Sequence, residues 1–314
     1  MNLKLKQLID DFIQTEALSG TSLVTTIFGD SIFHRGGVIS LASLIQLMEA
    51  FGFNERSVRT AVFRLVQNNW LSSEKIGRTS YYQLTEYSRQ RFSVADQKIY
   101  SVAQHEWDQK WDLVLLSSTE IENKLVLKKE LEWLGFANIA SNVMAYPGCD
   151  QQKLQNLLLS HQMTDQVVVF RAETLQLWQE SYPTIKRMVA VNWPIQELHQ
   201  RYEKFIGDFR EFFYFIENEE DIAPIQAFQI RILLIHQYRR ILLKDPSLPF
   251  ELLPNQWLSL VARNLSANLY QAIFNISDEY FLDIARTAEG SMPPAHPLFY
   301  KRFGGLKQFN LSCS

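Results

Sequence analysis

Cysteine is scarce in this chain of 314 residues, which contains only Cys149 and Cys313. Two cysteines so far apart do not form a disulfide framework, and their scarcity favours a reducing cytoplasm. Apolar runs are also short, because none approaches the ~18 residues that a membrane span needs. The first residues, MNLKLKQLIDDF, lack the apolar core of a secretory signal. We therefore expect a cytoplasmic protein with no membrane segment.

Several catalytic signatures are absent too. The sequence has no glycine-rich phosphate loop, no G-x-S-x-G elbow and no H-E-x-x-H zinc helix. No two of its six histidines stand three or four residues apart, so we expect neither a metal site nor a cofactor. Cys149 follows Pro147-Gly148 and is a candidate exposed thiol, but nothing in the sequence supplies a neighbouring base. We expect no catalytic residue.

Charge is distributed unevenly along the chain. The composition, 46% hydrophobic and 21% charged, is that of an ordinary soluble protein, and the length allows two or three domains. The whole chain carries a formal charge of −3, whereas residues 54–92 hold seven basic and three acidic residues, a net charge of +4. A basic segment in an acidic chain indicates a surface directed at a polyanion.

The basic segment predicts a helix followed by a hairpin. Asn54 can cap the helix, and its apolar face consists of Val58, Ala61, Val62, Leu65 and Val66. At 100° per residue the opposite face carries Arg56, Thr60, Phe63 and Gln67. Two short strands, 71–76 and 80–84, flank a tip of Gly77-Arg78-Thr79. A polar helix face with arginines and then a basic hairpin is typical of a winged helix that binds DNA.

Each residue type predicts a kind of contact with double-stranded DNA. Arg56, Ser57 and Thr60 are placed to reach base edges, and Arg59 and Arg64 to bind phosphates. Lys75, Arg78 and Thr79 would hold the backbone at the wing. The alternative is that these are ordinary surface arginines, because many helix–hairpin units bind nothing.

The rest of the sequence predicts an α+β multidomain protein. Helices over 22–34 and 41–51 precede the basic segment, which gives the order of a winged helix-turn-helix over residues 1–92. Residues 93–180 predict strand, helix, strand, helix and strand (111–116, 121–134, 138–146, 153–161, 166–170), a ferredoxin-like α/β domain. Residues 181–314 predict a helical C-terminal domain, with a long apolar seam from Ile195 to Ile216.

Two further clusters have open interpretations. Trp107 and Trp111 stand at the entrance to a strand, where core packing is the favoured reading. Arg239 and Arg240 precede Lys244 near the end of a helix. These cations suit the helix dipole, but they could equally hold an anionic ligand or brace a domain interface.

Six segments together resemble the PaaX family of bacterial repressors of phenylacetic acid degradation. They run from Ser19 to Leu306: SGTSLVTTIFGDSIFHRGG, NERSVRTAVFRLVQNNWL, IGRTSYYQLT, EWDQKWDLVLL, QYRRILLKDPSLPFELLP and KRFGGL. Asn69 and Gln109 stand where the family usually has glycine. The resemblance implies a GntR-like winged-helix domain, a central Cas2-like domain of ferredoxin-like fold, and a helical C-terminal domain.

The resemblance also implies a repressor released from its operator by phenylacetyl-CoA, and we expect a homodimer. Such an effector needs cations for its phosphates and an apolar slot for its ring, which Arg239, Arg240, Lys244, Trp257 and Tyr270 could supply. The rival class is an enzyme, either one that acts on a CoA thioester or a metal-dependent nuclease using Asp112 in the central domain. A third possibility is a DNA-binding scaffold that senses no ligand.

Overall fold

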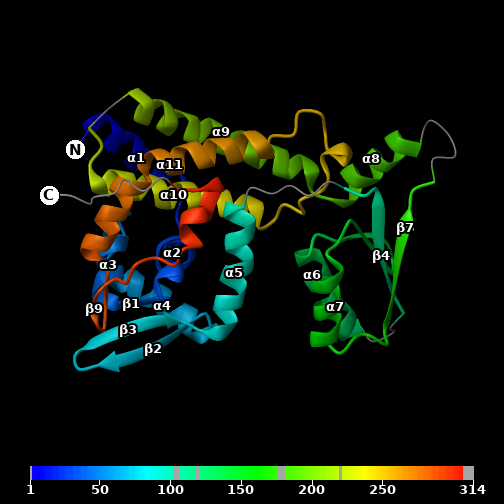
Figure 1. Cartoon of the computed structure of the whole chain (residues 1–314), viewed down its shortest axis with the longest axis horizontal. Coiled ribbons are helices and arrows are strands. Elements are labelled where there is room, and N and C mark those ends of the chain that lie inside the picture. The colour runs from blue at the N-terminus through cyan, green and yellow to red at the C-terminus, as the bar shows by residue number, and fades with distance from the viewer. Residues whose placement is uncertain (1, 102–106, 118–120, 176–180, 219–220, 307–314) are drawn as a thin grey trace. The chain divides into compact units, whose positions relative to one another are not determined.

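The computed structural model describes residues 2–101, 107–117, 121–175, 181–218 and 221–306. The chain divides into two compact units, whose elements are drawn in Figure 1. Unit 1 consists of Met1–Val102, Lys204–Arg240 and Leu260–Ser314, and unit 2 consists of Ala103–Glu203 and Ile241–Ser259. Cys313 lies outside the described residues.

The first hundred residues of unit 1 form helices around a small sheet. In this sheet β3 lies between β1 and β2, and both pairings are antiparallel. The elements are α1 (Leu3–Thr15), α2 (Gly20–Ile27), a π-helical turn (Phe28–Ile32), a 3-10 turn (Phe33–Arg35), β1 (Val38–Ser40), α3 (Leu41–Glu49), α4 (Glu55–Gln67), β2 (Leu71–Ile76), β3 (Thr79–Leu84) and α5 (Glu86–Tyr100).

The segment predicted as one helix over 22–34 is interrupted by the π-helical turn. Its apolar residues explain the interruption. Leu23 and Ile27 are four residues apart, whereas Ile32 lies five residues after Ile27, and all three are fully buried. One widened turn absorbs the extra residue and keeps the three side chains on the same face. Gly36 then ends the segment with a φ of 84°.

The remaining part of unit 1 comes from long helices and the end of the chain. The predicted seam is confirmed at Phe205, Phe209 and Phe212, which are buried. The elements are α9 (Ile195–Asn218), α10 (Pro224–Leu242), α11 (Ser259–Ile284), β8 (Arg286–Thr287), β9 (Gly290–Ser291) and a 3-10 segment (Phe299–Gly304). Unit 1 takes α9 from Lys204, α10 as far as Arg240 and α11 from Leu260.

The two units do not follow the predicted boundaries at residues 92 and 180. Unit 1 joins the first hundred residues to the later helices, because polar side chains from both parts are buried against one another, as described below. The division into three segments along the sequence stays a prediction.

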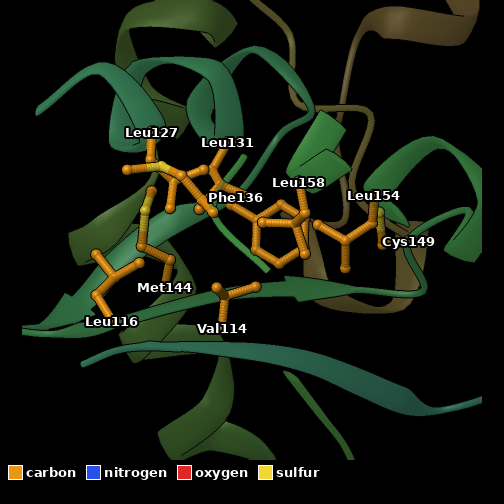
Figure 2. Packing of buried hydrophobic residues seen from close by; sticks show 10 residues of the cluster. Val114, Leu116, Leu127, Leu131, Phe136, Met144, Cys149, Leu154 and Leu158 are labelled. Carbon is orange, nitrogen blue, oxygen red and sulfur yellow. The ribbon is translucent and has the colours of Figure 1, made fainter. Parts of the chain in front are cut away.

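Unit 2 contains a four-stranded antiparallel sheet in the order β5-β6-β4-β7. The elements are β4 (Lys110–Leu116), α6 (Ile121–Trp133), β5 (Ala137–Ala140), β6 (Val143–Pro147), α7 (Gln151–Ser160), β7 (Val167–Glu173), α8 (Ser181–Asn192) and a 3-10 turn (Phe250–Leu252). Figure 2 shows the core between the sheet and α6 and α7, where Val114 and Met144 meet Leu131 and Leu158. The strand–helix–strand order and the central antiparallel pairing match the predicted ferredoxin-like α/β domain.

Two predictions about these strands are wrong. The single strand predicted over 138–146 is the hairpin of β5 and β6, which supplies the fourth strand that the sequence pattern did not place. The apolar run ending at Phe170 predicts a buried strand, whereas β7 lies at the sheet edge and Val168 and Phe170 are 45% and 50% exposed. An apolar run cannot distinguish a central strand from an edge strand.

Asn69 and Gln109, which stand where the family usually has glycine, have a backbone conformation that glycine favours. Asn69 and Gln109 adopt φ values of 58° and 62°, the left-handed region that glycine favours. Gln109 lies in the turn between Trp107 and Trp111, whose rings pack edge to face with centroids 5.9 Å apart. Trp111 is buried and also packs on Trp193, which confirms the core interpretation for Trp111, whereas Trp107 is half-buried.

Candidate nucleic-acid interface

Helix α4 has one buried and one open face, as its sequence predicts. The Asn54 side chain caps the helix by accepting hydrogen bonds from the backbone N–H and the hydroxyl of Ser57, both at 2.9 Å. The buried face packs on α2 and α3 through Val58, Ala61, Val62 and Leu65. The open face carries Arg56, Arg59, Thr60, Phe63 and Arg64, all exposed, whereas Ser57 is half-buried.

The arginines of this face differ in what holds them. Within the described part of the chain, the side chains of Arg56 and Arg64 make no hydrogen bond or ion pair. Arg59 is held by Glu55 one turn earlier, with Nε and Nη2 at 2.7 and 2.6 Å from the same carboxylate oxygen. Thr60 donates its hydroxyl to the carbonyl of Arg56 at 2.9 Å. The helix therefore presents two unpaired guanidinium groups and one that is oriented.

The hairpin places further cations at its end. Ile76 pairs with Thr79 across the tip, which leaves Gly77 and Arg78 as a two-residue turn. Gly77 has a φ of 62°, the conformation that such tight turns need and that glycine adopts without strain. Lys75 and Arg78 are exposed and Thr79 is half-buried. Thus the eight residues predicted to contact DNA lie on α4 and on the hairpin β2–β3, and their contact with DNA stays a prediction.

A buried ionic cluster, which sequence reasoning missed, anchors the segment before α4. Asp30 is fully buried, and its carboxylate accepts hydrogen bonds from the hydroxyls of Tyr100 at 2.7 Å and Tyr270 at 2.9 Å. Its other oxygen lies 2.8 Å from Nη2 of Arg231. Burial alone would raise the pKa of Asp30, but the charges of Arg231 and Arg302 lower it below its ordinary value.

The cluster extends in two directions from Asp30. Arg35 donates to Asp278 at 2.8 Å, and Arg231 also lies 3.3 Å from that carboxylate. Arg302 donates to the backbone carbonyl of Asp30 at 2.7 Å and pairs with a carboxylate on α5. Three arginines and three carboxylates therefore meet in the interior of unit 1: Arg35, Arg231, Arg302, Asp30, Asp96 and Asp278. The one charged residue in the apolar run IFGDSIF, Asp30, was the available signal in the sequence.

The five residues predicted to bind an effector have different surroundings. In unit 1, Arg239 donates to the Thr26 hydroxyl and to the Ser22 carbonyl, both at 2.8 Å, and Tyr270 belongs to the buried cluster. Arg240 is exposed. In unit 2, Lys244 is exposed, whereas Trp257 is buried against Tyr202 with ring centroids 5.7 Å apart. Effector binding at these residues stays a prediction.

Two groups considered for catalysis serve the packing of unit 2. Asp112 is fully buried and accepts hydrogen bonds from the Cys149 backbone N–H at 2.7 Å and from the Gln151 side chain at 2.6 Å. Cys149 is buried, so the prediction of an exposed thiol is wrong. Burial and the nearby carboxylates of Asp112 and Asp150 raise the pKa of this thiol to about 12, which keeps it protonated at neutral pH.

The described residues contain neither a metal-binding cluster nor a membrane-spanning helix. Among the described residues, no group of three or more histidine, cysteine or acidic side chains is placed to hold a metal ion. No helix in the described ranges is long and apolar enough to cross a membrane.

Comparison with known proteins gives matches along most of the chain. Three family models match: "PaaX-like protein" over residues 19–88, "PaaX protein central Cas2-like domain" over 104–182 and "PaaX-like protein C-terminal domain" over 193–283. The curated relative "Transcriptional repressor PaaX" of Escherichia coli (strain K12) is 39% identical over 305 residues, which cover 96% of each chain. A solved structure of an uncharacterized protein from Mycobacterium tuberculosis is 20% identical, with a TM-score of 0.48, and covers 76% of this chain and 89% of that one. The family models and the curated relative together show that this chain belongs to the PaaX family.

Proposed function

We propose that this chain is a sequence-specific DNA-binding repressor that uses α4 as a recognition helix and the hairpin β2–β3 as a wing. The observation that carries the proposal is the exposed arginine face of α4, with unpaired Arg56 and Arg64, followed directly by a hairpin that ends in Arg78. The naming of the Escherichia coli relative as a transcriptional repressor supports it.

In this function the two parts of the interface have different tasks. The open face of α4 enters the major groove, where Arg56 can donate two hydrogen bonds to one guanine. Lys75 and Arg78 bind phosphates beside the groove, which positions the helix but carries no sequence information. If the chain acts as a homodimer, two such helices read half-sites about one helical turn apart, roughly 34–36 Å, or a multiple of that.

Arginine variants separate these tasks. We expect Arg56→Ala to weaken binding to a duplex selected from a random library by about 1–3 kcal/mol and to relax the preference at one base pair. We expect Arg78→Ala to weaken binding to all duplexes alike and to reduce the slope of log K against log salt by about 0.9. Titrations by fluorescence anisotropy at several salt concentrations measure both effects.

The matched control is Arg210→Ala. Arg210 is an exposed arginine of unit 1 on α9, outside α4 and the hairpin. This variant has the same net charge as the other two, so it corrects for charge alone. Wild-type affinity and an unchanged salt slope for both Arg56→Ala and Arg78→Ala would contradict the proposal.

We further propose that phenylacetyl-CoA releases the protein from its operator, as the family resemblance implies. A ligand changes DNA binding only if it binds free and DNA-bound protein with different affinity. Reversing a strongly one-sided equilibrium needs a difference on the order of 10⁴-fold. We expect phenylacetyl-CoA to abolish the mobility shift of the selected duplex, and Arg240→Ala or Lys244→Ala to raise the concentration required.

Coenzyme A without the phenylacetyl group is the control for this prediction. It carries the same phosphates but lacks the aromatic ring, so we expect it to act only at much higher concentration. Equal affinity of phenylacetyl-CoA for free and DNA-bound protein would rule the release mechanism out. Hydrolysis of the thioester by the protein would favour an enzyme instead.

A further inference from the structure

One large apolar side chain stands on the open face of α4. Phe63 is 60% exposed, whereas every other phenylalanine that the structure describes in unit 1 is buried or half-buried. An isolated exposed apolar residue needs no explanation by itself. Here, however, the ring stands within a face that is otherwise polar and cationic. Few kinds of binding partner suit both the ring and the cations around it.

Phe63 belongs to a regular stripe along the helix. Arg56, Arg59, Thr60 and Phe63 are spaced i, i+3, i+4 and i+7, the spacing with which homeodomain recognition helices read bases. Together with Glu55 they line one open depression of about 620 Å³. The ring is therefore part of the surface that carries Arg56, the residue proposed to contact a guanine.

The chemistry of DNA leaves one good partner for this ring. A phenyl group cannot donate a hydrogen bond to a phosphate, and most groups on the major-groove edges of the bases are polar donors or acceptors. The 5-methyl group of thymine is the apolar group in that groove. The positive charge of residues 54–92, a net +4, favours DNA over an apolar protein surface as the occupant.

We propose that Phe63 contacts a thymine methyl group in the major groove and so determines specificity at that base pair. This inference rests on the proposed function, because it requires α4 to enter the groove. Phe63 stands seven residues after Arg56, which at 1.5 Å per residue is about 10 Å along the helix. At about 3.4 Å per base pair, this spacing would place the thymine roughly three base pairs from the guanine that Arg56 contacts.

Replacement of single thymines by deoxyuridine tests the inference, because it removes the methyl group and leaves base pairing intact. The probe is a duplex selected from a random library by the wild-type protein, with each thymine replaced in turn. At one position per half-site we expect the wild type to lose about fourfold in affinity, the value for one buried methyl group. Phe63→Ala should bind the duplex that contains thymine about fourfold more weakly than the wild type does. Deoxyuridine at that position should cause no further loss of affinity in this variant.

Phe63→Leu is the matched variant, since it keeps an apolar side chain and should keep sensitivity to the methyl group. Both variants should fold normally, because the ring makes little contact within the protein. The inference is overturned if wild type and Phe63→Ala respond alike to deoxyuridine at every position. It is also overturned if Phe63→Ala changes the oligomeric state, measured by sedimentation, because the ring then belongs to a protein interface.

The outcomes also separate this inference from the proposed function. If the wild type selects no sequence from the library, both fail. If the wild type selects a sequence, and Arg56→Ala weakens binding while no deoxyuridine substitution distinguishes Phe63→Ala, only the role of Phe63 fails.

Discussion

Asp30→Asn is expected to lower the free energy of unfolding of unit 1 by about 3–5 kcal/mol. The substitution keeps the shape of the side chain but removes the buried negative charge that faces Arg231 and Arg302. Burying an arginine is tolerable only when an opposite charge compensates for its lost hydration. Without Asp30, Asp96 and Asp278 must balance three buried guanidinium groups. Urea denaturation followed by far-ultraviolet circular dichroism measures the loss.

The matched control is the same change at an exposed ion pair. Asp10 lies 4.0 Å from Lys6 on α1, and the side chains of Lys6 and Asp10 are 53% and 44% exposed. Exposed pairs of this kind contribute about 0–1 kcal/mol, so Asp10→Asn should change the stability little. A loss for Asp30→Asn as small as that of the control would mean that the buried arginines do not depend on this carboxylate.

Acid is expected to destabilise the protein through His236, by about 2 kcal/mol from about pH 8 to about pH 5. Burial and the charges of Arg239 and Arg240 lower the pKa of His236 to about 3 in the folded protein, from 6.5. Between these values the unfolded chain binds a proton that the folded chain excludes. Stability is therefore fully present above pH 6.5 and falls as the pH decreases toward 3.

His236→Asn removes the titrating group and tests this directly. The asparagine amide can replace Nδ1 of the imidazole, which shares a hydrogen bond of 2.9 Å with the Thr26 hydroxyl. We expect the variant to lose about 2 kcal/mol less than the wild type over the same pH interval in urea denaturation. The control His161→Asn removes an exposed histidine of unit 2. This variant should lose as much stability as the wild type over the same pH interval. An identical acid response in His236→Asn and wild type would show that other groups cause it.

Local features were predictable where one element decides them. The exposure of Arg56 and the burial of Val58 follow from the helical period alone, and the cap at Asn54 follows from residue type. The left-handed backbone at Asn69 follows only from the glycine that the family usually has there, and asparagine tolerates that geometry.

Features that depend on distant partners were not predictable. Asp30 and Arg302 are 272 residues apart, and no local pattern indicates that they meet. The position of β7 in the sheet was not predictable either. Its apolar sequence is typical of a central strand, but β7 is an edge strand that pairs only with β4. Phe63 is a different case: the helical period alone places it on the open face of α4, but the sequence does not indicate what its ring contacts.

The buried cluster has a consequence for how the protein is made. A ribosome releases residues 1–100 long before Arg302, and until then Asp30 lacks one of its two guanidinium partners. The buried charges around Asp30 are therefore incompletely compensated until Arg302 has been synthesised. A fragment that ends before residue 302 would lack this partner permanently, so DNA-binding measurements require a chain that extends past Arg302.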